Sequence, residues 1–308
     1  MTAVAARAPA KVNVHLAVGP LRPDGFHELR TVYLAVSLFD TVTVRPGNGL
    51  ALTVTGEGAR AARGADLVPT DRRNLVWRAA ELLAAHAGVT ADATIDIAKA
   101  IPAAAGLAGG SADAAAALVA LDALWGTRAG REDLLALAAQ LGSDVPFSLV
   151  GGVALGAGRG EQLTPVLART RRHWVLGIAG EGLSTPAVYG ELDRLRAAGK
   201  VPDGEDLTAA ESAIAALRSG PTALLASSLA NDLQAPALAL RPELARALRA
   251  ATEAGAAGAL VSGSGPTVAV LADDERDAVR LTAELAGAGV FRTGRAVHGP
   301  VPGARLVG

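Results

Sequence analysis

A glycine-rich stretch at residues 101–111, with the sequence IPAAAGLAGGS, carries the clearest chemical signal in this chain. It follows residues 93–98, where apolar side chains alternate as in a strand, and leads into residues 111–125, where they recur at helical spacing. The first amides of a helix attract anions, and glycines let phosphate oxygens approach the backbone. The spacing fits neither a Walker A loop nor the dinucleotide fingerprint, so the stretch predicts a phosphate site or, alternatively, a tight structural turn.

A lysine in the first predicted strand is the second candidate. Lysine is rare in this arginine-rich chain, which suggests that Lys11 and Lys99 need a compact ammonium rather than a planar guanidinium. Lys11, Asn13 and His15 alternate with apolar residues over residues 10–18, so they are expected on one face of that strand. A solvated strand edge would give the same pattern.

Five segments extend these two signals over nearly the whole chain. They are residues 9–13 (PAKVN), 23–29 (PDGFHEL), 102–112, 141–146 (LGSDVP) and 261–266 (VSGSGP). In this order and spacing the sequence resembles the small-molecule kinases of the GHMP superfamily. The first two segments resemble in particular those members that phosphorylate the 2-hydroxyl of 4-diphosphocytidyl-2-C-methyl-D-erythritol, in non-mevalonate isoprenoid precursor biosynthesis.

The resemblance implies roles for individual residues. Lys11 and Asp144 match the catalytic pair, in which a carboxylate takes the proton of the acceptor hydroxyl while an ammonium lowers the pKa of that hydroxyl. The substrate pocket is matched by Asn13, Phe26, His27, Asp144 and Tyr189, with aromatic rings stacking on the cytosine and His27 reading its polar edge. The ATP site is matched by Asn74, Lys99, Pro102, Ala103, Ala104, Ala105, Gly106, Leu107, Ala108, Gly109, Gly110, Ser111 and Ala112.

Several of these residues also have ordinary structural explanations. Ser111 and Asn74 are typical helix N-caps, and Asp144 stands where an Asx-turn or N-cap aspartate is common. Ala105 and Ala108 stand where the family often has glycine, which restricts the backbone conformations of the loop. ATP is the expected phosphoryl donor, with Mg²⁺ bridging its phosphate oxygens, and no protein-bound metal site is predicted.

Composition narrows the class of protein. The chain has 308 residues, half of them hydrophobic, and a net charge of −1. That charge provides no basic surface for nucleic acid or anionic membranes, so the partners expected are small molecules. Cysteine is absent, which excludes disulfides and suits a reducing cytoplasm. No signal peptide or membrane span is recognisable, and we expect a cytoplasmic enzyme; oligomeric state is not indicated.

The pattern of elements predicts an α+β protein with two domains, residues 1–166 and 167–308, and the site in the cleft between them. The expected N-terminal elements are strands at 10–18, 31–37, 41–45, 50–55 and 93–98, helices at 74–87, 111–125 and 131–141, and a hairpin around 146–164. The C-terminal half is expected to be ferredoxin-like, with strands at 174–179, 257–261, 266–272 and 290–297, a helical block reaching 253 and a helix at 275–287. The resemblance implies that the N-terminal domain resembles ribosomal protein S5.

Three classes of function are compatible with this reading. The first is an ATP-dependent kinase acting on the cytidyl diphosphate sugar alcohol. The second is another superfamily enzyme of the homoserine or mevalonate type, which the Asp-Gly-Phe-His segment disfavours. The third is a non-catalytic nucleotide sensor, which would have no need of a proton acceptor such as Asp144.

Overall fold

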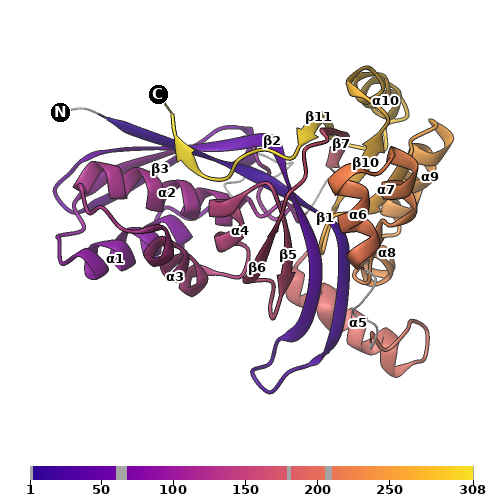
Figure 1. Cartoon of the computed structure of the whole chain (residues 1–308), viewed down its shortest axis with the longest axis horizontal. Helices are drawn as coiled ribbons and strands as arrows, with labels where there is room; N and C mark the ends of the chain where they lie inside the picture. The colour runs from indigo at the N-terminus through magenta and orange to yellow at the C-terminus, as the bar shows by residue number, and fades with distance from the viewer. Residues whose placement is uncertain (1–2, 60–67, 179–181, 205–209, 308) are drawn as a thin grey trace.

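The computed structural model describes residues 3–59, 68–178, 182–204 and 210–307. Two β-sheets with helices packed on them make up this part of the chain, and two long strands run from the first sheet toward the second (Figure 1). Within the described residues, no helix is both long enough and apolar enough to cross a membrane.

The first sheet is built around the antiparallel pair β1 (Val4–Leu21) and β2 (His27–Pro46). Its strand order is β12-β1-β2-β4-β3, with the β5–β6 hairpin attached to β2 and the short strand β8 lying parallel to β1. The remaining strands are β3 (Leu50–Thr55), β4 (Ala93–Ala98), β5 (Val153–Ala157), β6 (Gln162–Val166), β8 (Ala230–Asn231) and β12 (Arg305–Leu306).

The two long strands differ from the sequence prediction. β2 is continuous where two strands, 31–37 and 41–45, were expected, because irregularities in its pairing with β1 bend it without ending it. Another irregularity between Asn13 and His15 breaks the simple alternation of β1, and both faces of β1 are buried from Ala8 to Val18. Lys11 and Asn13 therefore share one face of β1, as expected, but the expectation that His15 lies on the same face is wrong.

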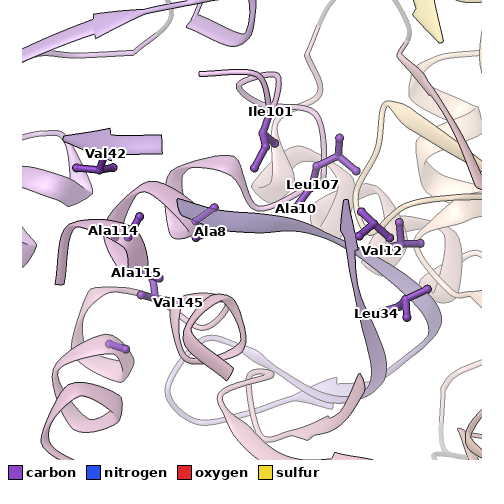
Figure 2. Close-up of a cluster of buried hydrophobic side chains, with 14 of the residues drawn as sticks. Ala8, Ala10, Val12, Leu34, Val42, Ile101, Leu107, Ala114, Ala115 and Val145 are labelled. Atoms are coloured by element: carbon purple, nitrogen blue, oxygen red, sulfur yellow. The ribbon is translucent and has the colours of Figure 1, made fainter. Parts of the chain in front are cut away.

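Helices cover one face of this sheet. They are the short 3₁₀ helix η1 (Glu57–Ala59), α1 (Leu75–Ala87), α2 (Gly109–Trp125), α3 (Arg131–Leu141) and α4 (Val145–Val150). All alanines of α2 except Ala123 are buried together with Leu118 and Leu121, and small side chains let a helix lie close to the strands beneath it. Figure 2 shows alanines of β1 and α2 beside Val42, Ile101 and Leu107 in this core.

Two helix boundaries also correct the prediction. α2 begins at Gly109 and not at residue 111, so Ser111 lies in its first turn and is not the N-cap. Residues 145–150 form α4, because Pro146 in the first turn supplies a backbone angle suited to a helix, and the predicted hairpin is confined to β5 and β6. The predicted helices at 74–87, 131–141 and 275–287 are confirmed to within a residue.

The second sheet has the strand order β11-β7-β10-β9 with antiparallel neighbours, which is the ferredoxin-like order, and the predicted α+β class is confirmed. The predicted strand at 174–179 corresponds to β7, and its last residue lies outside the described residues, as do residues 180–181 and 205–209 of the predicted helical block. The elements are β7 (Arg172–Ile178), α5 (Thr185–Ala197), α6 (Ala210–Ser219), α7 (Thr222–Ser227), α8 (Gln234–Leu240), α9 (Glu243–Glu253), β9 (Gly258–Val261), β10 (Thr267–Ala272), α10 (Glu275–Gly287) and β11 (Thr293–Gly299).

The chain crosses from the first sheet to the second between β6 and β7. It also returns, because β12 pairs with β1 and Pro302 bridges to Gly151. The division into residues 1–166 and 167–308 stays a prediction, since the last residues contribute a strand to the first sheet.

Candidate active site

The glycine-rich stretch forms a loop whose backbone is partly left-handed. Ala104, Gly106 and Ala108 have φ values of 53°, 75° and 57°. Ala108, the N-cap of α2, therefore takes the conformation that glycine adopts more easily, whereas Ala105 does not have a positive φ and is buried. Of the two alanines that depart from the family pattern, Ala108 is the one that bears a conformational cost.

The loop is held between the two halves of the protein. On one side, the amide of Lys11 donates a hydrogen bond to the carbonyl of Leu107 (3.2 Å). On the other, the hydroxyl of Ser262 donates to the carbonyl of Gly106 (3.4 Å). A side chain at Gly106 would lie only 2.9 Å from the carbonyl oxygen of Gly265, so this close approach requires glycine.

A cavity of about 270 Å³ lies where the loop meets the two long strands. Of the predicted ATP-binding residues, it is lined by Ala104, Ala105, Gly106, Ala108, Gly109 and Gly110. The cavity also contains Lys11, Asn13 and Asp144 from the first half and Thr185, Tyr189, Gly263 and Ser264 from the second. The backbone around the start of α2 thus faces the predicted catalytic pair across a small polar space.

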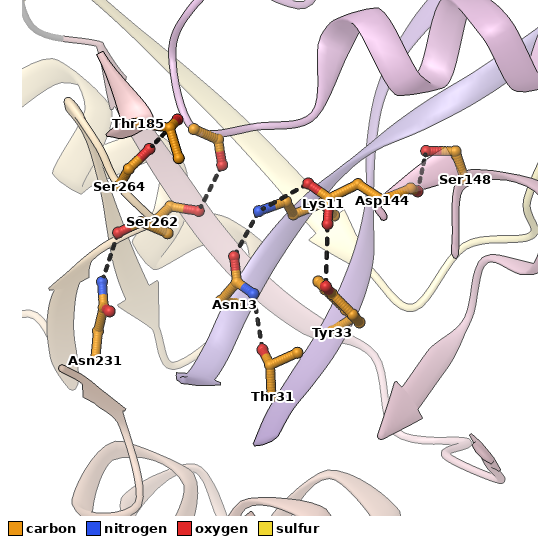
Figure 3. A network of polar contacts seen from close by, with 12 residues as sticks. Lys11, Asn13, Thr31, Tyr33, Asp144, Ser148, Thr185, Asn231, Ser262 and Ser264 are labelled. Atoms are coloured by element: carbon orange, nitrogen blue, oxygen red, sulfur yellow. Dashed lines mark hydrogen bonds and ion pairs between the residues drawn. The ribbon is translucent and has the colours of Figure 1, made fainter. Parts of the chain in front are cut away.

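The predicted catalytic pair is in contact. Lys11 Nζ lies 3.7 Å from Asp144 Oδ2, and the two side chains are 8% and 31% exposed. The same ammonium donates a hydrogen bond to Asn13 Oδ1 (2.6 Å), and Asn13 Nδ2 donates to Thr31 Oγ1 (2.7 Å) (Figure 3). Lys11 is therefore anchored by a buried amide on its own strand and can direct its charge at the carboxylate.

Tyr33, which the sequence analysis did not single out, completes this group. It lies opposite Asn13 in the β1–β2 pairing, and its hydroxyl donates a hydrogen bond to Asp144 Oδ1 (3.0 Å). Burial and the neighbouring carboxylate raise the pKa of Tyr33, so the hydroxyl stays a donor. No local motif marks Tyr33, because its contact with Asp144 spans 111 residues of sequence.

Asp144 is the N-cap of α4 by position, but its side chain makes no capping hydrogen bond. Its carboxylate instead meets Tyr33 and Lys11, while its backbone carbonyl accepts from the Ser148 hydroxyl (3.2 Å). The Asp144 carboxylate therefore does not cap α4 through its side chain and lines the first cavity instead, and its catalytic role stays a prediction.

A second cavity, of about 580 Å³, adjoins the first and shares Leu29, Asp144, Thr185 and Tyr189 with it. It is also lined by Phe26, His27 and Ser111, and so brings the predicted aromatic residues to the same cavity as Asp144 of the predicted catalytic pair. The rings of His27 and Tyr189 stack with centroids 5.2 Å apart. Burial, with a smaller contribution from Asp144, raises the pKa of Tyr189.

Residues from α5 hold the aromatic pair. His27 Nε2 lies 2.9 Å from Asp193 Oδ1, a contact that joins β2 to α5. Thr185 Oγ1 and Ser264 Oγ share a hydrogen bond of 2.9 Å at the base of the first cavity. Asp193 and Thr185 are further pocket residues, and polar side chains in a helix gave no sequence signal for them. Ser264 lies in the segment 261–266, which carried the resemblance without a role for this residue.

Lys99 does not line either cavity. Its ammonium is 1% exposed and donates to Asp40 Oδ2 (2.6 Å) and Asp113 Oδ2 (2.7 Å). Burial alone would lower the pKa of Lys99, but the two carboxylates outweigh it and the pKa is raised. The ammonium is committed to this buried cluster, and a contact of Lys99 with the nucleotide stays a prediction.

The cluster instead fixes the loop. Asp40 Oδ1 accepts hydrogen bonds from the amides of Ala100 (2.7 Å) and Ile101 (2.8 Å), where the loop begins. Lys99 connects this carboxylate to Asp113 in α2, beyond the end of the loop. Both ends of the glycine-rich loop are thereby connected to one buried ammonium.

The other predicted nucleotide residues do not line the first cavity. Asn74 caps α1, accepting from the amide of Val76 (2.9 Å) and donating to the carbonyl of Pro69 (2.7 Å), as its structural alternative proposed. Neither cavity is lined by Pro102, Ala103, Leu107 or Ala112. Their roles at a nucleotide, and that of Asn74, stay predictions.

Comparison with known proteins agrees with this arrangement. Residues 74–152 match the GHMP kinases N-terminal domain and residues 213–290 match the GHMP kinases C-terminal domain. A protein of Rhodococcus jostii named 4-diphosphocytidyl-2-C-methyl-D-erythritol kinase is 58% identical over 99% of this chain and 95% of its own length. A protein of the same name from Mycobacterium tuberculosis is 55% identical over 99% of this chain and 93% of its own.

Solved structures give the same result. A crystal structure of 4-(cytidine 5'-diphospho)-2C-methyl-D-erythritol kinase is 35% identical, covers 99% of both chains and superimposes with a TM-score of 0.74. Homoserine kinase from Cytophaga hutchinsonii has a TM-score of 0.76 at 20% identity, which shows a shared fold alone. With both GHMP domains and full-length relatives above half identity, this chain belongs to the 4-diphosphocytidyl-2-C-methyl-D-erythritol kinase family of ATP-dependent GHMP kinases.

Proposed function

We propose that this protein transfers the γ-phosphoryl group of ATP to the 2-hydroxyl of 4-diphosphocytidyl-2-C-methyl-D-erythritol, a step of non-mevalonate isoprenoid precursor synthesis. One observation carries the proposal: Lys11 and Asp144 meet in a cavity lined by the glycine loop, and this cavity adjoins one that contains aromatic rings from both halves of the chain. A donor phosphate and a cytidyl acceptor can therefore reach the same carboxylate. The predicted cytoplasmic location is part of this proposal.

The chain's own groups support an in-line transfer. Asp144 would accept the proton of the acceptor hydroxyl as that oxygen attacks the γ-phosphorus, and the Lys11 ammonium would offset the negative charge that develops on the attacking oxygen. The bond between the γ-phosphorus and the β,γ-bridging oxygen would break, and ADP would leave. Tyr33 and Asn13 hold these two side chains in position through hydrogen bonds of 3.0 and 2.6 Å. The amides at the start of α2 would bind the phosphate oxygens of ATP.

Mg²⁺ is proposed to accompany the nucleotide, where it would neutralise charge on the phosphate oxygens. Ser111 and Asp144 both line the second cavity and carry oxygen donors of the kind that Mg²⁺ prefers. Within the described residues, no group of three or more histidine, aspartate or glutamate side chains lies together as a dedicated metal site.

Two variants test the proposal. Asp144→Asn should keep the fold and ATP affinity but lower kcat by about two to four orders of magnitude, the usual contribution of a general base. Tyr189→Ala should raise the KM of the cytidyl substrate by about 5- to 150-fold, because base stacking contributes about 1–3 kcal/mol, and leave the KM of ATP within about twofold.

The wild-type specificity decides between the function classes. Methylerythritol phosphate, which lacks the cytidyl group, should be a poor acceptor. If methylerythritol phosphate, mevalonate or homoserine were turned over as fast as the cytidyl acceptor, the proposed cytidyl pocket would be wrong and another superfamily activity would be favoured. Retention of more than about half the turnover in Asp144→Asn would show that the carboxylate is not the base.

A further inference from the structure

The tip of the β5–β6 hairpin carries an arginine that the proposed mechanism does not use. We propose that Arg159 binds the diphosphate of the cytidyl acceptor and so determines specificity for a nucleoside diphosphate over a nucleoside. This inference rests on the proposed function, since it assumes that a cytidyl diphosphate compound occupies the second cavity.

The backbone of the hairpin tip is firmly placed. Arg159 lies between Gly158 and Gly160, which have φ values of 70° and 104° and so form a turn that other residues would strain. Gly158 donates its amide to Glu28 Oε1 (3.0 Å) and accepts from the amide of Leu29 (2.7 Å). The turn is thereby attached to the start of β2, next to Phe26 and His27.

The same turn also contacts the reacting centre. A methyl group at Gly160 would overlap the hydroxyl of Tyr33, the group that donates to Asp144. The turn therefore lies against Tyr33 on one side and against the aromatic residues on the other. In the acceptor, the diphosphate is the covalent link between the cytidine and the sugar alcohol that carries the reacting hydroxyl, so it must cross this region.

The guanidinium is available for an anion. Its Cζ lies 5.0 Å from the centroid of the Phe26 ring, and the side chain lines the second cavity together with His27 and Asp144. Its nearest carboxylate contact, from Nε to Glu161 Oε1, is long at 3.9 Å. Within the described part of the chain, the two terminal nitrogens of Arg159 make no hydrogen bond to protein.

The charges that line the cavity favour such a cation. Asp144 and Asp193 are the acidic residues that line it, and Arg159 is the one lysine or arginine among its described lining residues. The nearby Arg22 is held by Asp24 and Glu28 at 3.3 and 3.1 Å. Lys11 offsets Asp144 from the first cavity at 3.7 Å, so Arg159 is the cation within the second cavity that can offset Asp193 and an entering diphosphate. A planar guanidinium pairs well with two phosphate oxygens.

Binding of two simple probes tests this assignment. Cytidine and CDP are titrated by calorimetry into wild type, Arg159→Gln and Phe26→Leu, with excess ADP present to occupy the glycine loop. Arg159→Gln should lower the affinity for CDP by at least about tenfold and change the affinity for cytidine by no more than about twofold, since the substitution removes a charge-assisted contact to phosphate. Phe26→Leu should lower the affinities for CDP and for cytidine by the same factor. Arg159→Lys should bind CDP more tightly than Arg159→Gln and less tightly than wild type.

In turnover assays, Arg159→Gln should raise the KM of the acceptor and leave kcat and the KM of ATP unchanged. If Arg159→Gln lowers the affinities for cytidine and CDP by the same factor, or changes neither affinity, the guanidinium only packs on Phe26 and the inference is wrong. If wild type binds neither probe, the cytidyl pocket itself is absent, and the proposed function fails together with this inference.

Discussion

Tyr33→Phe is the perturbation that most directly tests how the reacting centre is built. The change removes one hydroxyl, which donates to Asp144 Oδ1 at 3.0 Å, and keeps the ring. That ring is 2% exposed and stacks on Phe147 with centroids 4.8 Å apart, so its packing should survive. We therefore expect a folded variant in which only the support of the Asp144 carboxylate is lost.

The size of the effect follows from the exposure of Asp144. A hydrogen bond to a charged group contributes about 1.5–3 kcal/mol when it cannot be replaced. Because the Asp144 side chain is 31% exposed, water can hydrate the freed oxygen, and the loss of stability should be only about 1 kcal/mol. Water does not hold the carboxylate in one orientation, so we expect the activation free energy to rise by about 1–2 kcal/mol, which corresponds to about a 5- to 30-fold lower kcat.

Steady-state kinetics with ATP and the cytidyl acceptor measure this change, and urea unfolding measures the stability. Thr282→Val is a suitable control, since it removes a hydroxyl that donates to the carbonyl of Ala278 (2.7 Å) within α10, remote from the site. The control should lose stability and keep kcat. A Tyr33→Phe enzyme with undiminished kcat would show that Lys11 alone orients Asp144, and the argument from the hydroxyl would be refuted.

Three further predictions concern the glycine-rich loop and the cluster of Lys99 that holds it. Gly110→Val should lower the affinity for ATP, measured by calorimetry, by at least about tenfold, because Gly110 is exposed in the first cavity. The fold should tolerate the change, since a Cβ at Gly110 has no contact closer than 3.8 Å. Unchanged affinity would mean that the loop is only structural. Ala108→Gly should raise the free energy of unfolding in urea by about 0.5 kcal/mol, because glycine relieves the cost of a left-handed alanine and this gain exceeds the entropy cost of glycine. The matched control Ala105→Gly should lower the free energy of unfolding by about 0.5–1 kcal/mol. A change of the same sign in both variants would contradict the inference that Ala108 is strained. Lys99→Met should lower the free energy of unfolding by about 3–5 kcal/mol, because two buried carboxylates would lose their cation, and a loss below about 1 kcal/mol would show that the cluster does not hold the loop.

Much of the site is visible in the sequence where the signal is local. The alternation over 93–98, the glycine loop and the apolar periodicity after it correctly predicted β4, the turn and α2, because each depends on residues close together in the chain. Asn74 was recognisable as an N-cap for the same reason. The order of strands and helices after residue 172 correctly indicated the ferredoxin-like sheet.

The pairing of distant groups was decided by the tertiary structure. Alternation along β1 reports which residues are apolar, but the irregularity after Asn13 and the partners opposite it depend on the register with β2, which places Tyr33 beside Asp144. Lys99 has the same residue type as Lys11 and lies near the same loop, yet it is buried between two aspartates that are 59 and 14 residues away in sequence. A sequence states which groups are available, whereas desolvation and charge pairing, which determine what each group can do, depend on neighbours that only folding brings within a few ångströms.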